Sequence, residues 1–262
     1  MKYVIAGLCC AWALAGAETA EQRGNRVVQE ALAALGGEQF LNLQDRVEDG
    51  RAYSFYRDQL TGLAKAKIST RNLPAEGPNK LAQVERQAFG KDEDHLILFT
   101  ESRGYQVTFR GAKPLPEDRQ ERYRESTRRG ILYILRHRLK EPGLIIEGKG
   151  ADVWQNTPVE VVDITDAENR VLTVYFNRHT KLPLRQVYIT RDPKTKDRDE
   201  FSTTFAKYRD VGNGIQWPYH VRSERNGEKT FELFSEVVTV NQNLSPELFQ
   251  LGSGLKVLPA DK

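Results

Sequence analysis

The segment NRHTKLP at 177–183 contains residue types from which small catalytic sites are built. A histidine beside a hydroxyl could transfer a proton, which would make the segment reactive. The same residues suit a tight connection between strands, because Asn177 and Thr180 can hydrogen-bond nearby backbone and the closing proline fixes φ. Strand-like apolar runs lie on both sides, at 171–176 and 184–189. The segment is therefore predicted to be a turn within a sheet.

The remaining titratable residues do not form a catalytic or metal-binding motif. The four histidines are His95, His137, His179 and His220. They form no HExxH, HxH or His-x3-His pattern, so a zinc site lacks its usual ligand spacing. No G-x-S-x-G nucleophile motif is present, and Gly252-Ser253-Gly254 lacks the strand and helix that should flank one. A hydrolase would need a histidine, a carboxylate and a hydroxyl in one cleft, which the sequence does not indicate. We expect no metal, no cofactor and no enzymatic activity.

The first 17 residues have the pattern of a secretory signal peptide. Lys2 is followed by an apolar run to Leu14, and Ala15-Gly16-Ala17 supplies the small residues of a cleavage site. Both cysteines, Cys9 and Cys10, fall inside this segment, so residues 18–262 would be free of disulfides and thiolate ligands. Lipidation of one of these cysteines is an alternative. The flanking apolar residues favour a soluble exported protein.

Charge and length narrow the class of protein further. The 262-residue chain carries 39 Lys and Arg against 36 Asp and Glu, a formal net charge of +3. A nucleic-acid-binding domain would normally show a larger basic excess. No low-complexity linker interrupts the chain, so 18–262 is predicted to be one domain, and a monomer.

The hydrophobic periodicity predicts an antiparallel sheet with two helices. Residues 20–35 have apolar positions on one helical face and end at Gly36-Gly37. Short alternating runs follow from about 44 to 113, with turns expected at Gly50 and Thr61-Gly62. A second helix is predicted over 116–140, with Gly130 as a point of bending. Further strands are predicted over 144–149, 152–164, 170–177, 184–191, 200–209, 215–225 and 228–241. Asn226-Gly227 is a strong hairpin signal.

The second helix is both basic and amphipathic. Such a helix can lie on anionic lipid headgroups. Alternatively, its apolar side packs on the core while its charged side faces water, which the interleaved Glu121 and Glu125 favour.

Aromatic residues are concentrated in the predicted strands. In several strands both alternating faces are apolar, as Tyr175 and Phe176 illustrate. A sheet with one wet face would alternate cleanly, so each face has a covering or one face holds an apolar ligand. The aromatic set is Tyr53, Phe55, Phe89, Phe99, Tyr105, Phe109, Trp154, Tyr175, Phe176, Tyr188, Phe201, Phe205, Trp217 and Phe231.

Residues 171–251 resemble the outer-membrane lipoprotein-sorting family of LolA and LolB. The resemblance rests on a strand end followed by Thr180-Lys-Leu-Pro183, then on a strand with a glycine-containing turn, and then on a closing strand and tail. The residues of the second and third elements are Tyr208, Gly214, Ile215, Pro218, Asn241, Leu244 and Phe249. Asn177 stands where the family usually has Asp.

The resemblance implies a strongly curved, unclosed antiparallel sheet, or half-barrel, with helices over its concave face. It also implies a periplasmic protein that binds acyl chains of lipoproteins or other lipids without a cofactor, with an inner- or outer-membrane protein as a further partner. An envelope sensor or assembly adapter of the same fold is the alternative. The residues expected to line the cavity are Tyr53, Phe55, Phe99, Phe109, Tyr175, Trp217 and Phe231. The helices at 116–140 and 20–35 are expected to form its lid, with Ile131, Leu132, Ile134 and Leu135 as the lid residues.

Overall fold

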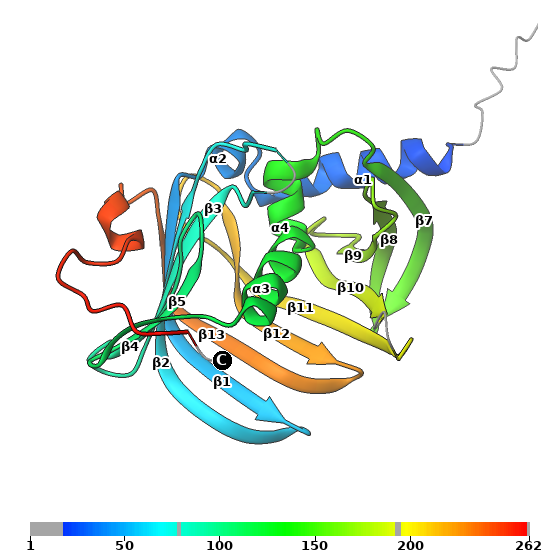
Figure 1. Cartoon of the computed structure of the whole chain (residues 1–262). Coiled ribbons are helices and arrows are strands. Elements are labelled where there is room, and N and C mark those ends of the chain that lie inside the picture. The colour runs from blue at the N-terminus through cyan, green and yellow to red at the C-terminus, as the bar shows by residue number, and fades with distance from the viewer. Residues whose placement is uncertain (1–17, 78–79, 192–194, 261–262) are drawn as a thin grey trace, which may run out of the picture.

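Thirteen strands form one antiparallel sheet in the computed structural model, which describes residues 18–77, 80–191 and 195–260 (Figure 1). Their spatial order is β6-β5-β4-β3-β2-β1-β13-β12-β11-β10-β9-β8-β7. β6 and β7 are the two edges, so the sheet is not closed, and the predicted curved, unclosed antiparallel sheet is confirmed. The strands are β1 (Asp45–Tyr56), β2 (Gln59–Asn72), β3 (Gln83–Phe89), β4 (His95–Phe99), β5 (Gly104–Thr108), β6 (Gly111–Pro114), β7 (Ile145–Trp154), β8 (Thr157–Thr165), β9 (Val171–Asn177), β10 (Pro183–Arg191), β11 (Arg198–Asp210), β12 (Gln216–Arg225) and β13 (Glu228–Val240).

The helices lie on the concave side and at one end of this sheet. Figure 1 shows α3 (Glu117–Arg128) and α4 (Ile131–Tyr133) inside the curve, and α1 (Ala20–Leu35) across the end formed by β7. The short α2 (Glu38–Leu41) follows α1, and a π-helical turn, η1 (Ile134–Arg138), continues α4. No described helix is long and apolar enough to cross a membrane.

The predicted first helix is confirmed over the expected residues. Thr19 caps it by accepting the Gln22 N–H at 3.1 Å, and the Gln22 side chain accepts the Thr19 N–H at 2.9 Å. Gly36, at φ 121°, ends the helix in a conformation that favours glycine. The apolar face is buried, and it comprises Val27, Val28, Ala31, Leu32 and Leu35.

The prediction of one continuous helix over 116–140 is wrong. The backbone at Gly130 is extended, with φ −67° and ψ 125°, and this separates α3 from α4. A break leaves backbone groups without helical partners. Here the Arg138 side chain donates to the Arg128 carbonyl at 2.7 Å, and the Gln186 side chain accepts the Ile131 N–H at 2.7 Å. Long-range side chains thus satisfy groups that a regular helix would pair internally.

Two turns lie at other positions than the sequence predicted. The first hairpin turns at Arg57 and Asp58, with φ of 49° and 58°, whereas Gly50 and Gly62 lie within strands. The second turns at Gln155 and Asn156, with φ of 46° and 60°, and not near Gly150. Gly150 marks a bulge in the β7–β8 pairing instead. Glycine in a strand often signals a bulge, and it was mistaken here for a turn.

The other two predicted turns are confirmed. Asn226 and Gly227 connect β12 and β13 with φ of 53° and 81°. At 177–183 the Asn177 side chain accepts the N–H groups of His179 at 2.8 Å and Thr180 at 3.0 Å. This local bonding is a turn between β9 and β10, as expected from the residue types.

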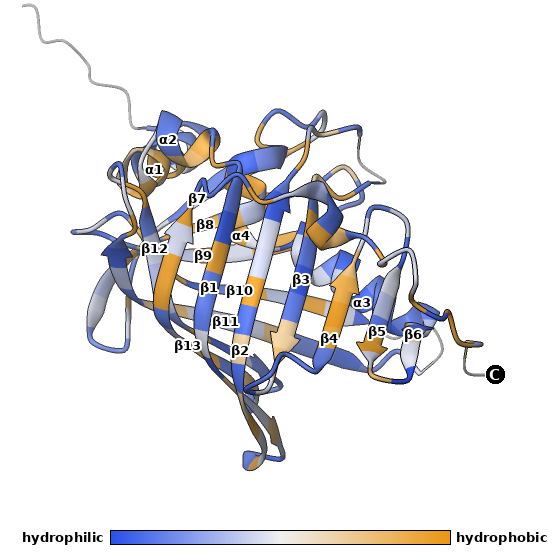
Figure 2. Ribbon diagram, turned by 90° about the vertical axis from the view of Figure 1, so that its left-hand side faces the viewer, coloured by the Kyte–Doolittle hydropathy of each residue, from blue (hydrophilic) through white to orange (hydrophobic). Residues whose placement is uncertain are grey.

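The chain after β13 crosses the convex side of the sheet. It contains the 3₁₀ turn η2 (Pro246–Phe249), whose Phe249 is buried. Further along, Ala112 of β6 exchanges two hydrogen bonds with Lys256 and Leu258, at 2.9 and 2.8 Å. β4, hydrophobic over most of its length in Figure 2, therefore belongs to a part of the sheet that is covered on both faces. This is one of the two explanations offered for strands with two apolar faces.

We expect Gly24→Ala to destabilise the protein, although alanine improves helix propensity by about 1 kcal/mol. A Cβ at Gly24 would lie 2.7 Å from the Gly148 nitrogen and 2.9 Å from the Ile146 oxygen, both backbone atoms of β7. Moving α1 away from β7 should cost about 1–3 kcal/mol. Denaturant unfolding would measure it, with the exposed neighbour Asn25→Ala as control. Stabilisation by Gly24→Ala would show that the helix–strand contact is loose.

Candidate functional site

The concave face of the sheet divides into two regions. The first is a continuous core in which α1, α4 and η1 pack against β8, β9, β11 and β12. Ile131, Ile134 and Leu135 are buried in it, and Leu132 is partly buried against it. The apolar side of the basic helical segment therefore packs on the core in this structure. Core residues from the sheet include Val162, Val174, Phe176, Phe205 and Trp217, and Ile215 joins them from the β11–β12 connection.

The second region is an apolar strip formed by the sheet itself. Its buried members are Ala52, Ala66, Ile68 and Leu233, with Phe89 and Phe231 packed against them. The register places them on one face, since Ala52 pairs with Leu233 and Ala66 pairs with Phe89. All of them come from β1, β2, β3 and β13, and Figure 1 shows β1, β2 and β13 extending beyond α3. We call these six residues the concave strip.

A polar cluster separates the core from the concave strip. Arg46 Nε donates to Glu48 Oε1 at 2.7 Å, and another nitrogen of Arg46 donates to Thr70 at 3.0 Å. The guanidinium also lies 4.0 Å from the ring centre of Trp217. Glu85 faces the same group across the sheet, and burial raises the pKa of its carboxyl. These bonds satisfy charged groups that an apolar surface alone could not hold.

α3 is attached to the sheet mainly through one aromatic contact. Tyr123 stacks on Phe99 of β4 with ring centres 3.5 Å apart, and its hydroxyl accepts a hydrogen bond from Gln83 at 3.3 Å. Burial raises the pKa of Tyr123 well above its usual value, so the phenol stays neutral. Gln120 adds bonds to the backbone of Gly104 and Leu115, at 3.1 and 2.8 Å.

Polar contacts attach η1 and α4 to α2, to the end of β2 and to the residue before β3. Arg136 donates to the carbonyls of Phe40, at 2.6 Å, and Leu41, at the C-terminal end of α2. Burial lowers the pKa of Arg136 to about 10, which still leaves the side chain charged at neutral pH. Tyr133 accepts the Ala82 N–H at 2.8 Å, and His137 Nε2 lies 3.2 Å from Asn72 Oδ1. The segment over the core is thus held at its margin by a few hydrogen bonds.

The seven aromatic residues predicted to line a cavity do not share one face. Phe99, Trp217 and Phe231 lie on the concave side. Phe99 contacts Tyr123 of α3, Trp217 belongs to the core, and Phe231 belongs to the concave strip. Alternation along the strands places Tyr53, Phe55 and Tyr175 on the convex side. Tyr53 packs edge-on against Phe234, and Tyr175 lies under the Arg185 guanidinium.

Phe109 was predicted to lie on a strand and is instead in the turn between β5 and β6. Its side chain is 89% exposed. A strand prediction that ran on through Arg110 explains the error, because Gly111 begins the next strand.

The geometry supports binding to an apolar group better than it supports a reaction. Among the described residues, no three His, Cys, Asp or Glu side chains form a group that could hold a metal ion. His220 is 3.6 Å from Glu232, but its ring is stacked on Phe234 on the convex face, with centres 4.1 Å apart. The residues of the candidate site that the sequence did not predict are Arg46, Glu48 and Glu85. Their charges at alternate strand positions were the available signal.

Comparison with solved structures identifies relatives of this fold. A domain described as an outer membrane lipoprotein-sorting protein, from Vibrio parahaemolyticus, has a TM-score of 0.57 at 11% identity, covering 88% of this chain and 97% of that one. A DUF1329 family protein from Desulfovibrio piger has a TM-score of 0.57 at 12% identity, with coverages of 87% and 97%. A LolA superfamily protein from Nitrosomonas europaea has a TM-score of 0.53 at 8% identity, with the same coverages.

The chain has the LolA-like fold. The resemblance found in the sequence is therefore confirmed at the level of fold. No family model matches the sequence, and neither does any curated protein. At these identities the LolA-like fold is what the proteins share, and what each of them binds does not follow from it.

We predict that the attachment of η1 weakens as the pH falls from 7 to 5. Burial, with a smaller contribution from Arg136, lowers the pKa of His137 from 6.5 to about 4. The unfolded chain therefore binds this proton first, so stability is complete above pH 6.5 and is lost as the pH falls towards 4. The loss should be at most about 2 kcal/mol between pH 7 and pH 5.

Chemical denaturation of wild type and His137→Gln at several pH values would measure this effect. Glutamine keeps a polar group near Asn72 without the titration. The two stability curves should lie close together at pH 7 and separate as the pH falls, with wild type losing up to about 2 kcal/mol relative to the variant by pH 5. Parallel curves would mean that His137 titrates normally in the folded protein.

Proposed function

We propose that the protein is a non-enzymatic periplasmic carrier, which holds acyl chains of a lipoprotein or another lipid on its concave face for transfer towards the outer membrane. The observation that carries this proposal is the concave strip, an apolar surface made by four strands. Burial of one CH₂ group contributes about 0.8 kcal/mol, so an acyl chain laid along such a strip gains affinity without polar contacts.

In this proposal the core region supplies the remaining space. The α4 and η1 segment acts as the lid, because Ile131, Ile134 and Leu135 occupy the part of the concave face next to the strip. The polar cluster around Arg46 marks the boundary between the two regions. A long chain would have to displace the lid, whereas a short one would contact the strip alone.

A sensor or adapter that binds a protein is the second candidate. Two observations favour it: side chains of α1, α4 and η1 fill the core region, and apolar side chains are exposed near the β1–β2 turn. Tyr56, Leu60 and Leu63 are 66%, 56% and 57% exposed. Such residues could contact a protein partner without any lipid.

We expect Phe231→Asp to abolish lipid binding if the protein is a carrier, because it places a charge in the concave strip. Tyr175→Asp is the matched control, since that partly buried aromatic side chain lies on the convex side beside Arg185. Titration with a fluorescent fatty-acid methyl ester, an uncharged lipid probe, would compare the variants, and circular dichroism would verify folding. Equal loss in both variants would argue against the concave strip as the binding surface.

Native mass spectrometry of the protein, purified from the periplasm without detergent, would test the carrier directly. We expect a stoichiometric acylated species that disappears after organic extraction, and its mass would give the class of cargo. A clean protein mass combined with no uptake of the fluorescent probe would exclude the carrier and favour the adapter.

A further inference from the structure

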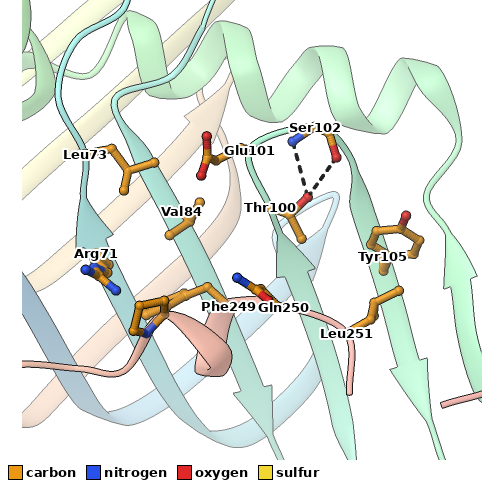
Figure 3. A pocket seen from close by; sticks show the side chains of 11 residues that line it. Arg71, Leu73, Val84, Thr100, Glu101, Ser102, Tyr105, Phe249, Gln250 and Leu251 are labelled. Atoms are coloured by element: carbon orange, nitrogen blue, oxygen red, sulfur yellow. Dashed lines mark hydrogen bonds between the residues drawn. The ribbon is translucent and has the colours of Figure 1, made fainter. Parts of the chain in front are cut away.

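A recess lies on the convex side of the sheet, away from the concave strip. It has a volume of about 340 Å³ and is an open depression between strands β2 to β5 and the chain after β13. Figure 3 shows Arg71 and Leu73 at one end, and Tyr105 and Leu251 at the other. Ligand pockets in proteins start at about 300 Å³, so the recess can hold a small molecule.

The walls of this recess are apolar along much of their length. Val84 and Phe249 are buried, and Leu73, Tyr105 and Leu251 are partly buried. Thr100 and Ser102 hydrogen-bond to each other and to nearby backbone, so their polar atoms are already engaged.

Arg71 is the cation of the recess. It lies opposite Val84 in the β2–β3 pairing, which places it on the convex face. Within the described ranges, its guanidinium has no ion pair, hydrogen bond or aromatic partner, and its side chain is only partly exposed. Most other partly buried arginines here are paired, as Arg86 is with Glu93 at 3.0 Å. A guanidinium left free in a partly apolar recess favours an anionic group that can take two of its hydrogen bonds.

We infer that this recess binds an apolar monocarboxylate. Arg71 binds the carboxylate, and the side chains of Leu73, Val84, Phe249 and Leu251 contact the apolar part. Glu101 also lines the recess, and its carboxylate disfavours a second negative charge on the ligand, although its ion pair with Lys80 at 2.8 Å reduces this repulsion. The site is separate from the concave strip, and its occupation does not depend on the proposed carrier function.

Decanoate and its neutral counterpart decanol are suitable probes, with 4-phenylbutyrate to distinguish an aliphatic from an aromatic ligand. Titrations into ¹⁵N-labelled protein at pH 8 would locate binding through amide shifts of Thr100, Tyr105 and Gln250. We expect shifts there with at least one carboxylate and none with decanol. Shifts with decanol as large as with decanoate, or no shift at 1 mM carboxylate, would overturn the inference.

Two variants test the role of charge. Arg71→Gln should weaken carboxylate binding by about tenfold or more, because it removes a charge-assisted pair. Leu251→Glu should do the same by placing a like charge in the recess, and it serves if Arg71→Gln folds poorly. Arg51→Gln is the control, since Arg51 is a convex-face arginine paired with Glu236 outside the recess.

The concave variant Phe231→Asp keeps this test distinct from the carrier test. It should abolish binding of the fluorescent methyl ester, which has no free carboxylate, and leave the carboxylate-induced shifts of Thr100 and Gln250 unchanged. Loss of those shifts in Phe231→Asp, or unchanged affinity in both Arg71→Gln and Leu251→Glu, would refute a convex carboxylate site.

Discussion

The pairing of β1 with β13 is the contact on which the rest of the structure depends. Without it, the strands would form two separate sheets, β6 to β1 and β13 to β7. It joins residues about 190 positions apart, so forming this pairing has a large cost in loop-closure entropy. Asp45, at the start of β1, holds the chain just after β13 by accepting the N–H groups of Gln242 and Leu244, at 2.7 and 3.0 Å. Gly50 is required at the bulge, because a Cβ there would lie 2.1 Å from the Phe234 oxygen.

The same pairing creates the division of the concave face. Glu48 lies next to the bulge and accepts a hydrogen bond from Ser235 of β13 at 3.0 Å, in addition to its bond with Arg46. On one side of Glu48 the residues of the concave face pack against helices. On the other side, in the concave strip, they pack only against residues of neighbouring strands. A bulge increases local twist, which bends the strands where the covering changes. The boundary of the candidate site is therefore a consequence of the strand pairing.

The sequence predicted the order of elements well because each local signal has a local cause. The helix at 20–35, the turn at Asn226-Gly227 and the turn at Asn177 all depend on bonds within a few residues. The candidate site depends on long-range choices that alternation alone does not settle. Trp217 and Tyr175 have similar strand contexts, yet one lies on the concave and the other on the convex face. The covering of the convex side by Phe249 could not be expected either, since tail packing has no periodic signature.

A carrier must replace buried apolar side chains of its own with an apolar ligand at little net free energy. α1 and the α4 and η1 segment differ in how well they suit this exchange. α1 is held by the contact of Gly24 with the β7 backbone, where any displacement separates closely packed main chains. The α4 and η1 segment has three well-buried aliphatic side chains, and exposing them costs on the order of 5–9 kcal/mol. An acyl chain of about ten CH₂ groups contributes a similar amount when buried in their place. In the proposed carrier, displacement of α4 and η1 by a lipid would therefore be close to balanced, and the polar contacts at the margin would influence its direction.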